Sequence, residues 1–232
     1  MLGMWIITLF GQAISGAHYN PAVTIVFMLR KNSTLGSRRM LGIMYIVAQF
    51  LGGIIAAIVS NIIDDVDEGG LVVAPMPDTD NDKKFIGAAV SELFGSFVFI
   101  FLFMLCTDAK TQFSKDKVIN CLIISSAYVS SRLMSGGKLV TRLMTVPNKY
   151  CGPLLNPALA LGQMIISFDF KYIWIYFLMP FGGAALALVF YEYVFVRSQE
   201  YLAGDSEDGD SQEDNLELDS NTDIKSTDEK SN

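Results

Sequence analysis

Two short segments of the sequence carry the same three residues in an otherwise apolar chain. The triplets are Asn20-Pro21-Ala22 and Asn156-Pro157-Ala158. Asparagine is a preferred N-cap, and proline suits the first turn of a helix because its missing N–H would have no intrahelical partner there. Each triplet therefore predicts the start of a helix. One copy alone would be a plain N-cap, whereas two copies favour a shared function.

The apolar stretches that follow the triplets are too short to cross a membrane. They cover residues 23–29 and 159–166, whereas a bilayer core of roughly 30 Å needs about 20 helical residues. Three longer apolar segments separate the triplets, and an odd number of crossings would put the second triplet on the opposite side of the membrane. We therefore predict two inverted half-helices, an arrangement that places transport sites near the midplane.

Two half-helices that meet tip to tip would bring two positive dipole ends together, with amide donors from Asn20 and Asn156 facing a lumen. Such a place repels cations and protons. Irregular backbone is tolerated at membrane depth where it lines a wet cavity, so the residues before each triplet should offer carbonyl acceptors. These residues are Gly16, Ala17, His18 and Tyr19 in the first loop, and Gly152, Pro153, Leu154 and Leu155 in the second. The pattern predicts a passive pathway for water or small uncharged solutes.

Composition indicates the elements that must position these motifs. Hydrophobic residues make up 51% of the 232 residues and charged residues only 18%, which is unusual for a soluble domain. The four long apolar runs cover residues 40–63, 85–106, 118–134 and 172–196. The third run reaches the required length only if it continues to Leu139, and residues 1–14 resemble the inner half of a further span. We predict an all-α membrane protein with about five full or partial spans.

Small residues at four-residue spacing within these runs predict close helix contacts in lipid. The spaced sets are Gly87, Ser91 and Gly95; Gly52 and Ala56; and Gly183 and Ala187.

The charges are concentrated at the carboxyl end. Net charge is −7, but residues 203–232 contain eleven acidic residues and two lysines. With so few large apolar side chains this segment should be disordered. We predict a channel domain over residues 1–200 and an acidic tail over 201–232. Basic residues slightly favour the side that bears the tail, which predicts a cytoplasmic tail; the sequence does not indicate which membrane holds the protein.

Few residues are suited to catalysis or metal binding. The chain has three cysteines without a close pair and one histidine, His18, too few for a metal site. No nucleophile or phosphate-loop motif occurs. We expect no enzymatic activity, no cofactor, no metal and no nucleic-acid partner.

From Met1 to about Phe195 the sequence resembles the aquaporin, or major intrinsic protein, family. The run over residues 14–24, including His18 and Thr24, looks like the first loop of that family. Further matches are Tyr45, Gln49, Gly52, Gly53, Glu92, Gly95, Trp174, Pro180, Gly182 and Gly183. The resemblance implies a right-handed helical bundle, a homotetramer with one pore per subunit, and a support role for Glu92, which would accept hydrogen bonds from the second loop. The alternative for Glu92 is a carboxylate at a helix end near the outer interface.

The sequence also departs from the family pattern. The family has six spans, and the resemblance implies that the first and the outer half of the second are missing, so we expect an N-terminally incomplete form of a longer protein. Leu159 stands where most members carry an arginine, which suggests a wider filter that admits glycerol, urea or ammonia. Ala160 and the pair Tyr176-Phe177 favour water instead. The filter candidates are Gly152, Pro153, Leu159 and Arg132.

Two choices stay open. Arg132 either extends to the membrane interface or turns inward to replace the missing filter charge. The chain as a whole is either a passive channel or a non-conducting, degenerate paralogue that acts as a membrane scaffold through its acidic tail. An ion-coupled transporter would share the broken helices, but the spans contain no chain of carboxylates or histidines for coupling.

Overall fold

The computed structural model describes residues 1–31, 33–64, 84–135 and 153–202. Every regular element in these ranges is helical, which confirms the all-α prediction. The chain divides into two compact units, Met1–Val189 and Phe190–Asn232. The first unit holds both triplets, so the site is described within it. The predicted division into a channel domain over residues 1–200 and an acidic tail over 201–232 stays a prediction.

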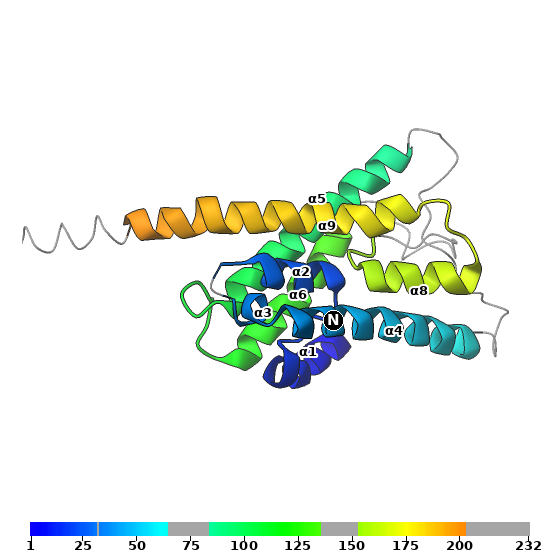
Figure 1. Ribbon diagram of the computed structural model, residues 1–232, viewed down its shortest axis with the longest axis horizontal. Coiled ribbons are helices and arrows are strands. Elements are labelled where there is room, and N and C mark those ends of the chain that lie inside the picture. Colours follow the sequence, from blue (N-terminus) through cyan, green and yellow to red (C-terminus); the bar gives the residue numbers. More distant parts are fainter. Residues whose placement is uncertain (32, 65–83, 136–152, 203–232) are drawn as a thin grey trace, which may run out of the picture. The chain divides into compact units, whose positions relative to one another are not determined.

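The helices follow one another without strands between them in the described ranges (Figure 1). They are α1 (Leu2–Ser15), α2 (Pro21–Leu29), α3 (Thr34–Ser37), α4 (Arg39–Asp64), α5 (Lys84–Thr107), α6 (Lys117–Ser135), α8 (Pro157–Ser167) and α9 (Ile173–Phe190). The two half-helices, α2 and α8, begin at the prolines of the two triplets and have 9 and 11 residues. Both are too short to cross a bilayer core.

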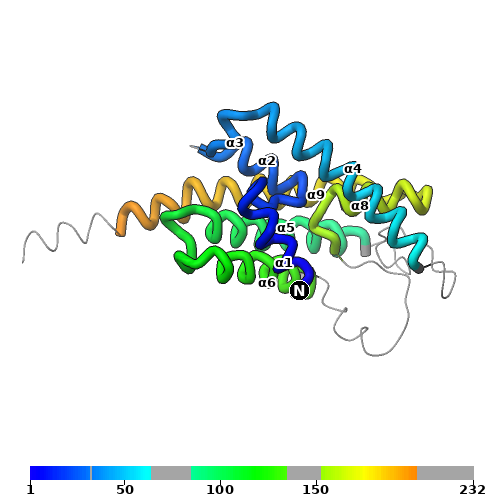
Figure 2. The backbone as a smooth tube through the Cα atoms, turned by 90° about the horizontal axis from the view of Figure 1, so that it is seen from below, coloured from blue at the N-terminus to red at the C-terminus, as the bar shows by residue number. Residues whose placement is uncertain are grey.

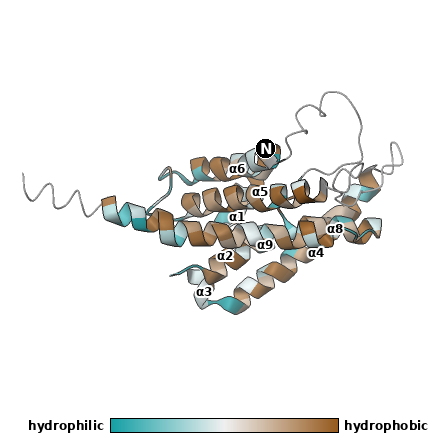
Figure 3. Ribbon diagram, turned by 90° about the horizontal axis from the view of Figure 1, so that it is seen from above, coloured by the Kyte–Doolittle hydropathy of each residue, from teal (hydrophilic) through white to brown (hydrophobic). Residues whose placement is uncertain are grey.

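Within the residues that the structure describes, three helical runs are long and apolar enough to cross a membrane: Arg39–Ile63, Phe85–Thr107 and Ile173–Leu202. Figure 3 shows the hydrophobic colour over most of α4, α5 and α9. Helix α1 has 14 residues and could span only in part. Helix α6 has 19 residues and is less apolar, because buried serines such as Ser125 and Ser131 interrupt it. The residues after Ser135 that could lengthen it lie outside the described ranges.

Helix α5 lies at the centre of the first unit and α4 at its edge. In the most apolar stretch of α5, half of the residues are buried, whereas in the corresponding stretch of α4 only 17% are buried. Helix α5 packs beside α6, and α1 also packs on α6, as both the ribbon and the tube show (Figures 1 and 2). Exposed large apolar residues such as Met44, Leu51 and Ile55 on α4 suit contact with lipid.

Glycine lets α4 and α8 approach each other closely. A methyl group on Gly53 would overlap the carbonyl of Ala158, and one on Gly162 would overlap the carbonyl of Gly53. Gly183 of α9 lies equally close to the Leu93 carbonyl of α5, as its spacing predicted. A methyl group on Gly52 of α4 or on Gly87 of α5 would meet no atom of the described residues within 4 Å, so the predicted close contact was wrong at these two positions. The face of α4 that packs on α8 is the one that contains Gly53.

The second unit is described only over residues 190–202. It begins with a π-helical turn, Tyr191–Phe195, in which the rings of Tyr191 and Phe195 stack at 6.1 Å. The acidic residues of the predicted tail, from 203 onward, lie outside the described ranges.

Candidate functional site

The two triplets start their helices by the same geometry. Asn20 has φ −150° and ψ 122°, and its Oδ1 accepts a hydrogen bond from the Ala22 N–H at 2.9 Å. Asn156 has φ −142° and ψ 107°, and its Oδ1 accepts from the Ala158 N–H at 3.0 Å. Each asparagine is therefore an N-cap, and each proline occupies the position where a missing N–H costs nothing.

The remaining amide of each asparagine reaches the other half-helix. Asn20 Nδ2 donates to the Leu155 carbonyl at 2.7 Å, and Asn156 Nδ2 donates to the Tyr19 carbonyl at 2.9 Å. Tyr19 and Leu155 each precede an asparagine, and both have positive φ, 46° and 57°. This left-handed backbone is costly for residues other than glycine. It recurs at equivalent positions, so the two loops form a reciprocal pair with the tips of α2 and α8 in contact.

A buried carboxylate supports the second loop. Glu92 of α5 is 1% exposed; its Oε1 accepts from the Leu154 N–H at 2.6 Å and its Oε2 from the Leu155 N–H at 2.9 Å. These are the bonds that the family resemblance implies, and the carboxylate does not lie at an exposed helix end. Charge-assisted bonds of this kind are the stronger hydrogen bonds in proteins, so Glu92 fixes the backbone just before Asn156.

Two side chains of α6 hold the carbonyls of the same loop. Tyr128 Oη donates to the Leu154 carbonyl at 3.0 Å, and Arg132 Nε donates to the Pro153 carbonyl at 2.7 Å. The Arg132 guanidinium carbon lies 5.8 Å from the centre of the Tyr128 ring. Arg132 therefore turns toward the loop instead of extending to the interface. Sequence reasoning missed Tyr128, although its position one turn before Arg132 places both on one face of α6.

These contacts limit what the second loop can offer to a solute. Its carbonyls were expected to line the pathway, but those of Pro153, Leu154 and Leu155 already accept from Arg132, Tyr128 and Asn20. Each can offer at most its second lone pair to a solute. Gly152, the other residue expected there, lies outside the described ranges.

The first loop is held by aromatic and hydroxyl contacts. Gly16 and Ala17 have φ of 78° and 52°, and Tyr19 Oη donates to the Ile7 carbonyl of α1 at 3.0 Å. Behind the triplet, Thr24 Oγ1 donates to the Asn20 carbonyl at 3.1 Å, and Gln49 Nε2 of α4 donates to Thr24 Oγ1 at 2.8 Å.

His18 is packed among aromatic rings. Its ring centre lies 4.7 Å from that of Phe27, 5.9 Å from Phe103 and 6.4 Å from Tyr45. Its Nδ1 is buried and has no hydrogen-bond partner among the residues that the structure describes. A buried nitrogen of this kind requires a partner such as water.

A cavity of about 370 Å³ adjoins the meeting point of the half-helices. Its lining comes from the first loop, the middle of α4 and the start of α8. The lining residues are Ser15, His18, Tyr19, Tyr45, Ala48, Gln49, Gly52, Gly53, Asn156, Ala158 and Leu159. Both half-helices direct their positive dipole ends toward this region. The cavity thus combines polar groups from His18, Gln49 and Asn156 with an apolar wall.

The filter candidates do not all meet in the cavity. Leu159 lines it, whereas Pro153 and Arg132 are not among its lining residues. The Arg132 guanidinium binds the Pro153 carbonyl and lies over the Tyr128 ring, so it turns inward toward the second loop, and a filter role for it stays a prediction. In the part of the chain that the structure describes, no three metal-ligating side chains come together.

Comparison with known proteins adds a family match. The family described as Major intrinsic protein matches residues 1–191. The chain is 29% identical to aquaporin-1 of Bos taurus over 183 residues, which cover 78% of this chain and 59% of the relative. It is 28% identical to aquaporin-1 of Homo sapiens over 182 residues, covering 78% and 60%, and 27% identical to aquaporin TIP1-2 of Musa acuminata over 187 residues, covering 80% and 65%. The chain therefore spans about three fifths of the length of these curated relatives.

Proposed function

Because the chain belongs to the major intrinsic protein family, we propose that it forms a passive membrane channel for water. The observation that carries the proposal is the reciprocal pair of hydrogen bonds between Asn20 and Leu155 and between Asn156 and Tyr19. These bonds place two helix N-termini beside a cavity in a chain whose long helices are suited to a membrane. Members of this family are channels and not enzymes, which favours conduction over catalysis.

The electrostatics of the meeting point support a neutral solute. Two N-terminal dipole ends repel cations, and the nearby carboxylate, Glu92, is already bound to two backbone N–H groups. Water can still bind there, since each asparagine amide keeps a second N–H, and the His18 Nδ1 has no partner within the described ranges.

We also propose that small uncharged solutes pass. Leu159 lines the cavity, and Ala48, Gly52 and Gly53 add apolar or small surface opposite the polar groups. A wall without charge at Leu159 would admit glycerol, urea or ammonia, which bring both apolar and hydrogen-bonding surface. We propose that the channel is a homotetramer. Each subunit would have a channel domain over residues 1–200 and a cytoplasmic acidic tail over 201–232.

Osmotic swelling tests this function. The full chain, purified and reconstituted into liposomes, is compared with empty liposomes by stopped-flow light scattering, first in an osmotic gradient and then in isotonic glycerol or urea. We expect faster water flux with the protein and faster solute entry for at least one solute. Ile62→Val on the exposed face of α4 is the matched control and should leave both rates unchanged.

One further variant and one outcome of the swelling assay decide between the proposals. Leu159→Arg should slow entry of glycerol and urea while water flux persists, and an unchanged solute rate would contradict the role of Leu159. Flux no faster than in empty liposomes, with the protein helical and inserted, would favour the non-conducting scaffold.

A further inference from the structure

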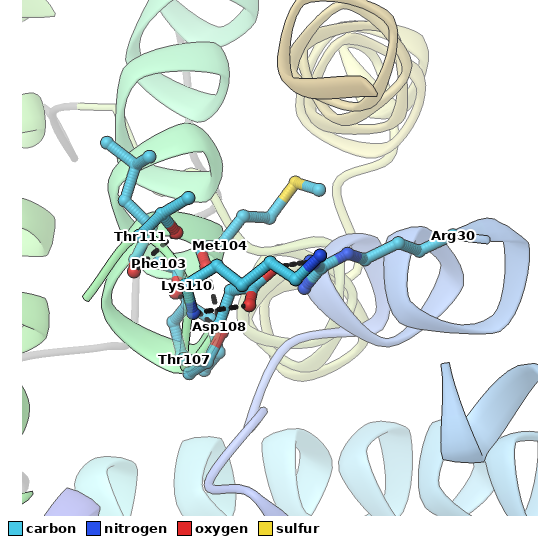
Figure 4. A network of polar contacts seen from close by, with 8 residues as sticks. Arg30, Phe103, Met104, Thr107, Asp108, Lys110 and Thr111 are labelled. Atoms are coloured by element: carbon cyan, nitrogen blue, oxygen red, sulfur yellow. Dashed lines mark hydrogen bonds and ion pairs between the residues drawn. The ribbon is translucent and has the colours of Figure 1, made fainter. Parts of the chain in front are cut away.

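An ion pair joins the far end of the first half-helix to the end of α5. Arg30 caps the carboxyl end of α2, and Asp108 directly follows α5, 78 residues later. The Arg30 Nη2 contacts the Asp108 Oδ2, and the two side chains are 14% and 19% exposed. Figure 4 shows the two side chains meeting between the helices. A pair this buried leaves a poorly solvated charge when one partner is removed.

The Asp108 side of the pair is held in place by its own turn. Asp108 Oδ1 accepts from the Lys110 N–H at 2.9 Å, and the Asp108 N–H donates to the Met104 carbonyl at 3.2 Å. Thr107 Oγ1 donates to the Phe103 carbonyl at 2.9 Å (Figure 4). Thr111 Oγ1 donates to the Leu105 carbonyl at 3.1 Å. The Phe103, Met104 and Leu105 carbonyls in the last turns of α5 therefore have donors, and the Lys110 N–H holds the Asp108 carboxylate in place.

The Arg30 side of the pair leads to the cavity. The Arg30 guanidinium carbon lies 6.0 Å from the centre of the Phe27 ring, which is one turn earlier on α2. Phe27 packs on His18 at 4.7 Å and on Phe103 of α5 at 5.7 Å, and His18 in turn lies 5.9 Å from Phe103. His18 lines the cavity. A continuous set of contacts therefore runs from Asp108 through Arg30 and Phe27 to His18.

We infer that the Arg30–Asp108 ion pair is a positioning contact for His18. It fixes the distance between the end of α2 and the end of α5, and so keeps the rings of Phe27 and Phe103 closed around the histidine at the cavity wall. This positioning role rests on the contacts described above and does not require that the chain conduct. Its effect on permeation rests on the proposed channel function.

His18 gives a readout that does not depend on conduction, because it is the only histidine in the chain. The full chain in liposomes is treated with diethylpyrocarbonate, and modification of His18 is followed by mass spectrometry. In the unsubstituted chain the buried ring should react slowly. Arg30→Ala and Asp108→Ala should each raise the rate threefold or more, and the exchange Arg30→Asp with Asp108→Arg should return it toward the original value.

Two variants serve as controls. Lys115→Ala removes an exposed charge from the same loop between α5 and α6 and should leave the rate unchanged. Arg30→Lys keeps the charge without the planar guanidinium and should give an intermediate rate, which keeps the test usable if the alanine variants do not fold. Circular dichroism identifies such unfolded variants.

The outcomes separate the two proposals. Rates in Arg30→Ala and Arg30→Lys that equal that of the unsubstituted chain, or no recovery in the exchanged pair, would overturn the positioning role. Altered His18 reactivity in a chain that conducts nothing would retain the positioning role and reject the channel. If the chain conducts, water flux should change in Arg30→Ala and recover in the exchanged pair.

Discussion

The loops before α2 and α8 end in the same geometry but are supported by different chemistry. In the second loop, Glu92 holds two backbone N–H groups, and Tyr128 and Arg132 hold two carbonyls. In the first loop, no carboxylate among the described residues accepts from the N–H of His18 or Tyr19, and packing of His18 against aromatic rings takes its place. A charged, buried support depends on one residue, whereas a cluster of rings spreads the same task over several contacts. The second loop should therefore be the more sensitive to single substitutions.

The largest effect is expected for Glu92→Ala. The change leaves the Leu154 and Leu155 N–H groups buried without an acceptor, and bonds to charged groups contribute about 1.5–3 kcal/mol each, so the loss should be about 4 kcal/mol. Thermal unfolding in detergent measures it. Glu92→Gln keeps one acceptor and should lose less. Stability equal to that of the unsubstituted chain in both variants would contradict the role of Glu92 in the second loop.

Gly53→Leu tests whether α4 also positions the second half-helix. The added side chain would collide with the Ala158 carbonyl, and overpacking should cost about 3 kcal/mol. Gly52→Leu is the matched control, because its Cβ would meet no described atom within 4 Å and the residue faces the cavity. We expect Gly52→Leu to unfold near the original temperature but to slow water flux. Equal destabilisation by both variants would argue against the α4–α8 contact.

The two asparagines provide an internal comparison. Asn20→Ala and Asn156→Ala each remove an N-cap and one bond to the opposite loop, for a loss of about 2 kcal/mol each. Because the bonds are reciprocal, the two losses should be similar, and the double variant should lose less than their sum if the loops act as a unit. Unfolding temperatures of the three variants test this, and strictly additive losses would show that the loops are independent.

Arg132→Ala should have a smaller effect, about 1.5 kcal/mol, because it removes one bond from a partly exposed side chain. The measurements are unfolding temperature, proton leak and solute size limit in liposomes. Since Arg132 does not line the described cavity, stability should fall while the size limit stays. A changed size limit with unchanged stability would support the filter role of Arg132.

The smallest effect is expected for Gln49→Leu, which removes the bond to Thr24 behind the first triplet at a cost of about 1 kcal/mol. Tyr128→Phe, which removes one neutral bond to the second loop, is its counterpart. We expect similar small shifts in unfolding temperature for the two variants. A much larger loss for Gln49→Leu would mean that the first loop is the less robust of the two.

Much of the site could be predicted because its signals are local. The triplets combine an N-cap with a proline, and that pattern alone determines where α2 and α8 begin. The inverted arrangement, inferred from the number of apolar runs between the triplets, stays a prediction. The contacts of Glu92 were anticipated only through the family resemblance, because a single carboxylate in an apolar run does not indicate its partner.

The rest depends on contacts between residues far apart in the sequence. Nothing local links Arg30 to Asp108, or Tyr128 to Leu154. The choice between Gly52 and Gly53 turns on helix rotation, since adjacent residues point about 100° apart. The direction of Arg132 also depended on tertiary contacts, because the sequence alone allowed the guanidinium either to extend to the membrane interface or to turn inward.

The reciprocal bonds have a consequence for biosynthesis. Asn20 donates to a carbonyl 135 residues downstream, so this bond cannot form until most of the chain has left the ribosome. The amino-terminal half must enter the membrane with its asparagine amide satisfied by water or by a temporary partner. The contact between the two loops therefore forms late in maturation. A translation product that stops before Leu155 cannot form the hydrogen bond from Asn20.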